Sequence, residues 1–104
     1  MKILSVTILA AALSVASFSV FAGDPEAGKA KSRTCAGCHG ANGISNSPMW
    51  PNLAGQKDQY AAKQLRAYRD GTRVDPNMNG ISQTLTDAQI EALAAYYAKQ
   101  PGGG

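Results

Sequence analysis

The clearest pattern in the chain is a helical repeat of apolar residues near the C-terminus. Apolar residues fall at i, i+3, i+4 and i+7, which places on one helix face Ile90, Leu93, Ala94 and Tyr97. Thr86 and Gln89 have the spacing of a capping box, in which the two residues satisfy each other's backbone N–H groups. Leu85 can pack against Ile90 as a hydrophobic staple. The pattern predicts a helix that begins after Thr86 and ends before Pro101.

Two earlier segments also carry helix signals. A helix is predicted from about Pro25 to about Arg33, because Asp24 can cap it and a proline followed by glutamate suits the first turn. A second helix is predicted from about Lys57 to Asp70, and the glycine that follows is a typical C-terminal stop. Roughly one side of this second helix carries Tyr60, Leu65 and Tyr68.

Two long segments between the predicted helices lack any periodicity. Residues 40–56 and 71–84 are rich in glycine, proline, asparagine and serine, which predicts irregular structure. Loops of this length inside a small domain are usually functional or wrapped around a ligand. The sequence shows no strand pattern, no internal repeat and no second domain. The expected fold is therefore all-α, with three main helices joined by long loops.

The first 22 residues have a different character. Lys2 precedes a run without charged residues from Ile3 to Ala22. A membrane helix needs about 20 apolar residues, whereas a secretory signal needs a positive start, an apolar core and small residues before the cut. Serines dilute the run and it ends in alanine, which favours a cleaved signal peptide at 1–22 and export to the periplasm. The alternative is a retained membrane anchor. The mature domain is then expected at 23–104.

Composition adds a constraint on the core of this mature domain. Nine basic residues remain after Lys2 is removed, against seven acidic ones, and this mild positive balance does not suggest a nucleic-acid partner. A domain of this size buries little apolar surface and usually needs an additional stabilising element. Its aliphatic residues beyond alanine are few: Ile44, Leu53, Leu65, Val74, Ile81, Leu85, Ile90 and Leu93. Something other than side chains is expected to complete the core.

The only two cysteines and the only histidine stand together as Cys35-Ala-Gly-Cys38-His39. This spacing is the attachment signature of c-type haem, because two such thiols reach the two vinyl groups of one porphyrin and the histidine lies under the iron. A thioredoxin-like site is expected near a βαβ pattern, and structural zinc needs four ligands. A plain disulfide gives the histidine no role. The motif favours one covalently attached haem c, which would also fill the core.

The second axial ligand of such a haem has two candidates in the mature chain. Met49 follows His39 by only ten residues, in a loop flanked by prolines. Met78 lies 39 residues after His39, which leaves enough chain to pass round the edge of a porphyrin to its other face. The sequence favours Met78, with Met49 as the alternative. A methionine ligand is typical of electron carriers, whereas an open position binds small molecules.

The segment after the motif offers support for the histidine. A ligating histidine usually donates its other ring N–H to a carbonyl or carboxylate, which orients the ring. Within "WPNLAG" at 50–55, Pro51 can supply the carbonyl and Leu53 can lie against the haem face. An ordinary Pro-Asn turn with a buried leucine explains the same residues.

With these residues in hand, the sequence resembles class I cytochromes c, and in particular the small monohaem bacterial type that is similar to one half of the periplasmic dihaem cytochromes c. The resemblance covers nearly all of 23–100 and is carried by Met78 and by "GDPEAGKAK", "CAGCHG", "PNLAGQ", "YAAKQLRAYRDG" and "LTDAQIEALAAYYA". It implies thioethers at Cys35 and Cys38. It also implies His39 and Met78 as axial ligands, with Pro51 as the histidine's acceptor.

The resemblance also implies that the first and last helices cross. Gly28 is then expected to let the first helix approach an aromatic residue of the last one. Tyr97 is the expected partner because it lies on the apolar face, and Tyr96 is the alternative. Ser32 stands where many relatives carry a large aromatic residue, so the crossing is expected to be less well filled.

The expected function is single-electron transfer without enzymatic activity and without a small-molecule substrate. Expected partners are periplasmic or membrane-bound redox proteins. The alternative is a haem enzyme or small-gas sensor with an open sixth position. A basic cluster near the second helix has three interpretations: a docking patch for an acidic partner, a solvated face neutralised by Asp58 and Asp70, or partners for haem propionates. It comprises Lys57, Lys63, Arg66, Arg69 and Arg73.

Overall fold

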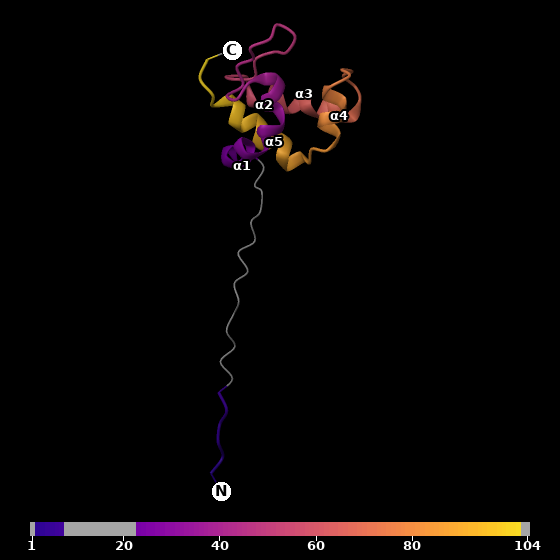
Figure 1. The fold of residues 1–104 in the computed structure, drawn as a ribbon. Coiled ribbons are helices and arrows are strands. Elements are labelled where there is room, and N and C mark those ends of the chain that lie inside the picture. The colour runs from indigo at the N-terminus through magenta and orange to yellow at the C-terminus, as the bar shows by residue number, and fades with distance from the viewer. Residues whose placement is uncertain (1, 8–22, 103–104) are drawn as a thin grey trace.

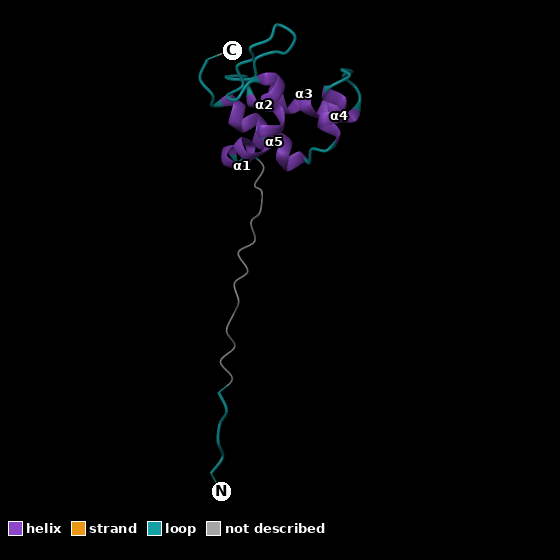
Figure 2. Ribbon diagram, viewed as in Figure 1, coloured by secondary structure: helices purple, strands orange, loops and turns teal. Residues whose placement is uncertain are grey.

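The computed structural model describes residues 2–7 and 23–102 of the chain. The expected signal peptide lies for its greater part outside these residues. The described residues form five helices and no strand, which confirms the all-α expectation (Figures 1 and 2). The helices are α1 (Pro25–Lys31), α2 (Arg33–His39), α3 (Asp58–Asp70), α4 (Met78–Gln83) and α5 (Asp87–Ala98). Within the described ranges, no helix has the length and apolar character needed to cross a membrane.

The three main helices begin and end where local signals place them. The Asp24 carboxylate accepts a hydrogen bond from the backbone N–H of Glu26 at 3.1 Å and caps α1. Gly71 ends α3 in a left-handed conformation with φ of 83°, which a residue without Cβ adopts at little cost. Thr86 and Gln89 form both hydrogen bonds of the capping box at α5. The expectation of three main helices is confirmed.

Two short helices are additional to this expectation. The first helix ends at Lys31 and α2 follows directly, so both cysteines lie on a helix rather than beyond one. The prediction of irregular structure throughout 71–84 was wrong, because α4 occupies part of that segment. Its start is fixed by Asp75, whose carboxylate accepts hydrogen bonds from the backbone N–H groups of Asn77 and Met78, both at 2.9 Å.

The first and last helices cross closely, as Figure 1 shows for α1 and α5. Gly28 makes the crossing possible, because a Cβ at this position would overlap the Ala92 carbonyl and lie 2.8 Å from the Cβ of Tyr96. The choice of Tyr97 as the partner of Gly28 was therefore wrong, and Tyr96 takes this place. Tyr97 lies on an adjacent face of α5, where it packs against Gly43.

The core lies mainly along α5. It comprises Ala62, Leu85, Ile90, Leu93, Ala94, Tyr96 and Tyr97. Cys35, Leu53 and Leu65 pack against it and are only partly buried. These three residues face the region where a cofactor is expected to complete the thin core.

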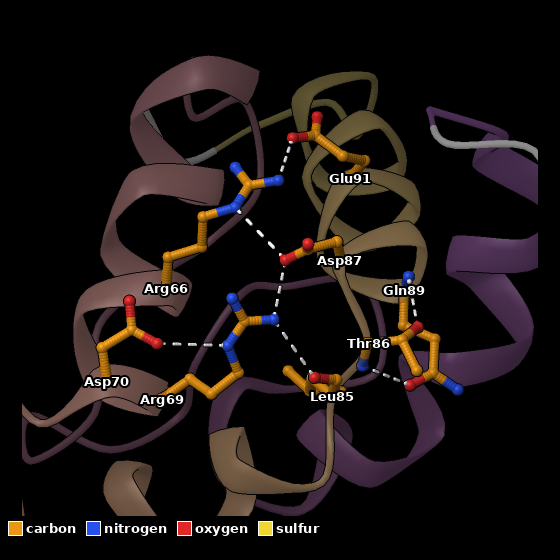
Figure 3. Close-up of polar contacts among 8 residues, drawn as sticks. All are labelled: Arg66, Arg69, Asp70, Leu85, Thr86, Asp87, Gln89 and Glu91. Carbon is orange, nitrogen blue, oxygen red and sulfur yellow. Dashed lines mark hydrogen bonds and ion pairs between the residues drawn. The ribbon is translucent and has the colours of Figure 1, made fainter.

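Charged side chains tie α3 to α5 (Figure 3). Arg66 pairs with Glu91, and Arg69 donates from Nη1 to the Asp87 carboxylate at 2.7 Å. The hydrogen bond from Arg69 holds the pKa of Asp87 below its usual value, and in return raises the pKa of the Arg69 guanidinium. Two members of the basic cluster are thus neutralised by acidic side chains of the same chain.

Candidate functional site

A cavity of about 290 Å³ opens between the helices and the 40–56 segment. Its lining contains both cysteines, His39, Met49 and Met78. The remaining apolar lining includes Leu53, Leu65, Ile81 and Leu93. Helices α2, α3, α4 and α5 all contribute residues, so the fold brings together side chains that lie far apart in the sequence.

His39 is the last residue of α2 and is buried. Its Nδ1 lies 2.8 Å from the carbonyl oxygen of Pro51. Because a carbonyl oxygen can only accept, Nδ1 carries the proton in this contact. An imidazole held in this way is ready to bind a metal through Nε2.

Backbone hydrogen bonds shape the 40–56 segment beside His39. The carbonyl of Gly43 accepts from the N–H groups of Leu53 and Ala54, at 2.7 and 3.0 Å. The N–H of Gly55 donates to the carbonyl of Tyr97 at 2.9 Å, which attaches the segment to α5. Gly40, with φ of 85°, reverses the chain directly after the histidine. The loop is thus a folded structure that presents Pro51 to the ring.

Met78 is the first residue of α4 and is half-buried. Asp75 binds the backbone N–H of Met78, and the Asn79 side chain holds Asp75 in turn by accepting from its N–H at 2.7 Å. The amide nitrogen of Asn79 donates to the carbonyls of Tyr68 and Arg73, at 2.8 and 2.9 Å. Hydrogen bonding to two N–H groups lowers the pKa of Asp75. This network fixes the backbone from which Met78 projects.

The other methionine also borders the cavity, but from its rim. Met49 is 79% exposed, and its neighbours Trp50 and Pro51 are exposed as well. Its backbone N–H donates a hydrogen bond to the hydroxyl oxygen of Ser47 at 3.2 Å. The structure therefore brings both methionines to one cavity, and they differ in burial.

Tyr97 contributes a buried phenol to the lining. Its hydroxyl forms no hydrogen bond within the described residues, although Ser32 and Cys35 lie nearby. Burial raises the pKa of this phenol well above its usual value, so it is neutral at physiological pH. Ser32 is itself buried, and its hydroxyl donates to the carbonyl of Lys29 at 2.7 Å. An apolar cavity with one unpaired hydroxyl is suited to a large, mostly apolar group.

Some lining residues were anticipated and others were not. Tyr60, Leu65 and Tyr68 were expected on one side of α3, and that side faces the cavity. Gln64 and Ile81 also line it and were not singled out as site residues, because no local pattern marks them.

Residues 25–100 match the family model for cytochrome c. The chain belongs to the cytochrome c family. Cytochrome c-554(548) of Halomonas halodenitrificans is 44% identical over 82 residues, which cover 76% of this chain and 99% of that protein. The crystal structure of reduced cytochrome c4 from Pseudomonas stutzeri superimposes with a TM-score of 0.75 and 38% identity, covering 79% of this chain and 48% of that one.

A third relative of this cytochrome c is a thiosulfate dehydrogenase electron acceptor from Thiomonas intermedia. It is 41% identical over 104 residues, which cover 98% of this chain and 46% of that protein. The chain thus spans less than half of the length of these longer relatives. The expected resemblance to class I c-type cytochromes, and to one half of a two-haem type, is confirmed.

Membership in the family implies covalently bound haem c and a role in electron transfer. The residues present fit this cofactor. Two thiols, one oriented imidazole and two methionine thioethers border a single cavity whose remaining lining is largely apolar. The haem would also cover Leu53 and Leu65, which the protein alone leaves only partly buried.

Proposed function

We propose that this chain is a periplasmic carrier of single electrons. In this proposal Cys35 and Cys38 bind haem c through thioethers, and Leu53 packs against it. His39 and Met78 are the axial ligands of its iron. The main support is that all of these residues line one cavity, although 39 residues separate the two proposed ligands.

The cofactor supplies an iron that accepts and releases one electron. The protein's part is to keep both axial ligands in place and to limit the access of water. Pro51 orients the imidazole of His39 through the 2.8 Å contact, and Asp75 and Asn79 hold the turn that carries Met78. With methionine bound, the reduction potential is raised and no position remains for a substrate. We therefore propose a carrier rather than an enzyme.

The proposed partners are redox proteins of the periplasm or the membrane surface. The positively charged start and uncharged run of residues 1–22 support export through a cleaved signal peptide. The Thiomonas intermedia relative is named as an electron acceptor of thiosulfate dehydrogenase. A periplasmic dehydrogenase is accordingly the class of donor that we propose, and the mature domain at 23–104 is the part that would meet it.

A redox-titrated absorption spectrum of the exported protein tests the proposal. We expect a low-spin c-type spectrum with a weak sulfur-to-iron band in the ferric form, and haem that stays with the chain on denaturing electrophoresis. Met78→Ala should abolish the sulfur band, whereas Met49→Ala, the matched control, should leave it unchanged. Loss of the band in the control alone would make Met49 the ligand. Ready binding of carbon monoxide by the reduced parent protein would instead support an open sixth position.

A further inference from the structure

The phenol of Tyr97 is a buried polar group beside the segment that carries the two cysteines. Tyr97 is only 5% exposed, and it lines the cavity together with Cys35. Its hydroxyl forms no hydrogen bond to any residue of the ranges 2–7 and 23–102. A hydroxyl buried without a partner loses its bonds to water and gains none in return. The position of this hydroxyl in the cavity therefore points to a partner that is formed when the cofactor is attached.

Tyr97 keeps its proton at physiological pH. Burial raises the pKa of this phenol well above its usual value, and the nearby thiol of Cys35 acts in the same direction. The neutral phenol can donate one hydrogen bond. Cys35 also packs against the core cluster to which Tyr97 belongs. The hydroxyl and the cysteine sulfur are thus neighbours, and the hydroxyl has a proton to give.

Two other hydroxyl groups near Cys35 have already used their protons. Ser32 and Thr34 each donate to the backbone carbonyl three residues earlier, at 2.7 and 3.0 Å. The Thr34 oxygen also lies 3.8 Å from Sγ of Cys35, where it can accept from a thiol but has no further proton to donate. Of these three described hydroxyls, the one on Tyr97 is the donor that remains uncommitted.

We propose that the Tyr97 hydroxyl donates a hydrogen bond to the sulfur of Cys35 when this sulfur is a haem thioether, an inference that rests on the proposed function. A thioether sulfur carries no proton and can only accept. It therefore matches the uncommitted proton beside it, and the pair satisfies the buried hydroxyl. Ser32 is the alternative acceptor, but it does not line the cavity.

The proposal makes Tyr97 a positioning residue with an effect on electron transfer. Hydrogen bonds to the groups that surround an iron centre tune its reduction potential. An O–H group that donates to the thioether directs the positive end of its dipole toward the haem. This favours the ferrous state, which carries one positive charge less than the ferric state. Removal of the hydroxyl alone should therefore lower the midpoint potential.

Three variants of the exported holoprotein, each lacking one hydroxyl, test this role: Tyr97→Phe, Ser32→Ala and, as the matched control, Tyr96→Phe. The control removes the same group from the neighbouring residue of α5, which does not line the cavity. Midpoint potential, covalent haem content and free energy of unfolding are measured for each. We expect Tyr97→Phe to lower both the midpoint potential and the free energy of unfolding, with haem content kept. Ser32→Ala and Tyr96→Phe should leave the midpoint potential unchanged.

The sign of the stability change separates this inference from a hydroxyl that stays unpaired. Removal of an unpaired buried hydroxyl stabilises the folded state, so a gain of stability in Tyr97→Phe with an unchanged midpoint potential would overturn the inference. A loss of stability without a midpoint shift would overturn it as well, because Ser32 would then be the acceptor. In both cases the haem stays attached and the proposed function stands.

Proton magnetic resonance of the ferrous parent protein provides a test that needs no stable variant. We expect a slowly exchanging hydroxyl proton of Tyr97 that lies close to the Cβ protons of Cys35, and a rapidly exchanging one would contradict the proposed bond. A parent protein without covalent haem would overturn the proposed function together with this inference.

Discussion

The two sides of the cavity are built by different means. On the side of His39, backbone hydrogen bonds to Gly43 and from Gly55 fix the segment and attach it to α5, and glycines with positive φ allow the path. The side chains of Ser45 and Asn52 add bonds within this segment. On the side of Met78, two polar side chains do this work. Asp75 and Asn79 together bind five backbone groups of the surrounding turn and of the end of α3.

The difference indicates how each side responds to change. The 40–56 segment is attached to the buried helix α5, through the carbonyl of Tyr97. The Met78 side is attached to the C-terminal part of α3 and its following turn, through the carbonyls of Tyr68 and Arg73. We therefore expect the Met78 side to loosen without unfolding the α1–α5 crossing, whereas damage to the His39 side reaches the core.

The largest loss of folding stability is expected from Gly40→Ala on the His39 side. Gly40 has φ of 85° and ψ of 158°, and a Cβ there would overlap the Ile44 carbonyl. Strain and overlap together should cost about 3–5 kcal/mol of the free energy of unfolding. Gly71→Ala is the matched control, because Gly71 has φ of 83° but open space around its Cβ position, and it should cost about 1 kcal/mol. Denaturant unfolding measures both, and equal losses would contradict the role of the Ile44 contact.

The next largest effect is expected from Asn79→Leu on the Met78 side. The substitution preserves approximate size but leaves two carbonyls and one N–H without their partner, at a local cost of about 2–3 kcal/mol. The sulfur-to-iron band should weaken, and amide exchange should accelerate in 73–83 but not in 40–56. Asn77→Ala is the control, because the Asn77 side chain caps nothing in α4. Faster exchange in both segments would show that the two sides are not independent.

The sequence predicts best those parts of the fold whose signals are local. The capping box of α5 and the glycine after α3 lie within a few residues of the structure they determine. The short helix α4 escaped prediction because its start depends on Asp75, and α2 escaped because it continues almost directly from α1. Short helices receive little stability from their own residues, so contacts with neighbouring segments determine whether they form.

For the site as well, residues with local signals in the sequence could be predicted, and residues whose roles depend on distant partners could not. The Cys-x-x-Cys-His motif is contiguous, so Cys35, Cys38 and His39 could be singled out at once. The particular partners of Asn79 could not be predicted, because Tyr68 and Arg73 lie eleven and six residues before it. The wrong choice of Tyr97 beside Gly28 has a related cause. A single apolar face was assumed for α5, whereas the helix is buried on two sides, with Tyr96 toward α1 and Tyr97 toward the cavity.

Removing a serine hydroxyl is expected to change folding stability by a smaller amount. The change should be a gain on the Met78 side and a loss on the His39 side. Ser82 in α4 is fully buried and its hydroxyl lacks a hydrogen bond to any described residue. Ser82→Ala should therefore stabilise the protein by about 1 kcal/mol. Ser45 on the His39 side accepts from the N–H of Ser47 and donates to its carbonyl, so Ser45→Ala should destabilise by a similar amount. Thermal unfolding of the two variants checks the signs, and a loss in Ser82→Ala would point to a bound water at this hydroxyl.

The smallest loss of folding stability is expected from Asp87→Asn. This substitution weakens the ion pairs between α3 and α5, the helices to which the two sides of the cavity are attached. Arg69 lowers the pKa of Asp87, so the ionised carboxylate contributes stability above its unfolded pKa of about 3.9 and loses this contribution as pH falls through the lower folded value. The variant should be slightly less stable than the parent at neutral pH, and the difference should vanish in acid. Because Asp87 joins α3 to α5, amide exchange should rise equally in 40–56 and 73–83. Asp58→Asn, at the exposed start of α3, is the control, because Asp58 forms none of the ion pairs between α3 and α5, and it should leave amide exchange in both segments unchanged. A rise in Asp87→Asn confined to one segment would show that the ion pair supports that side of the cavity alone.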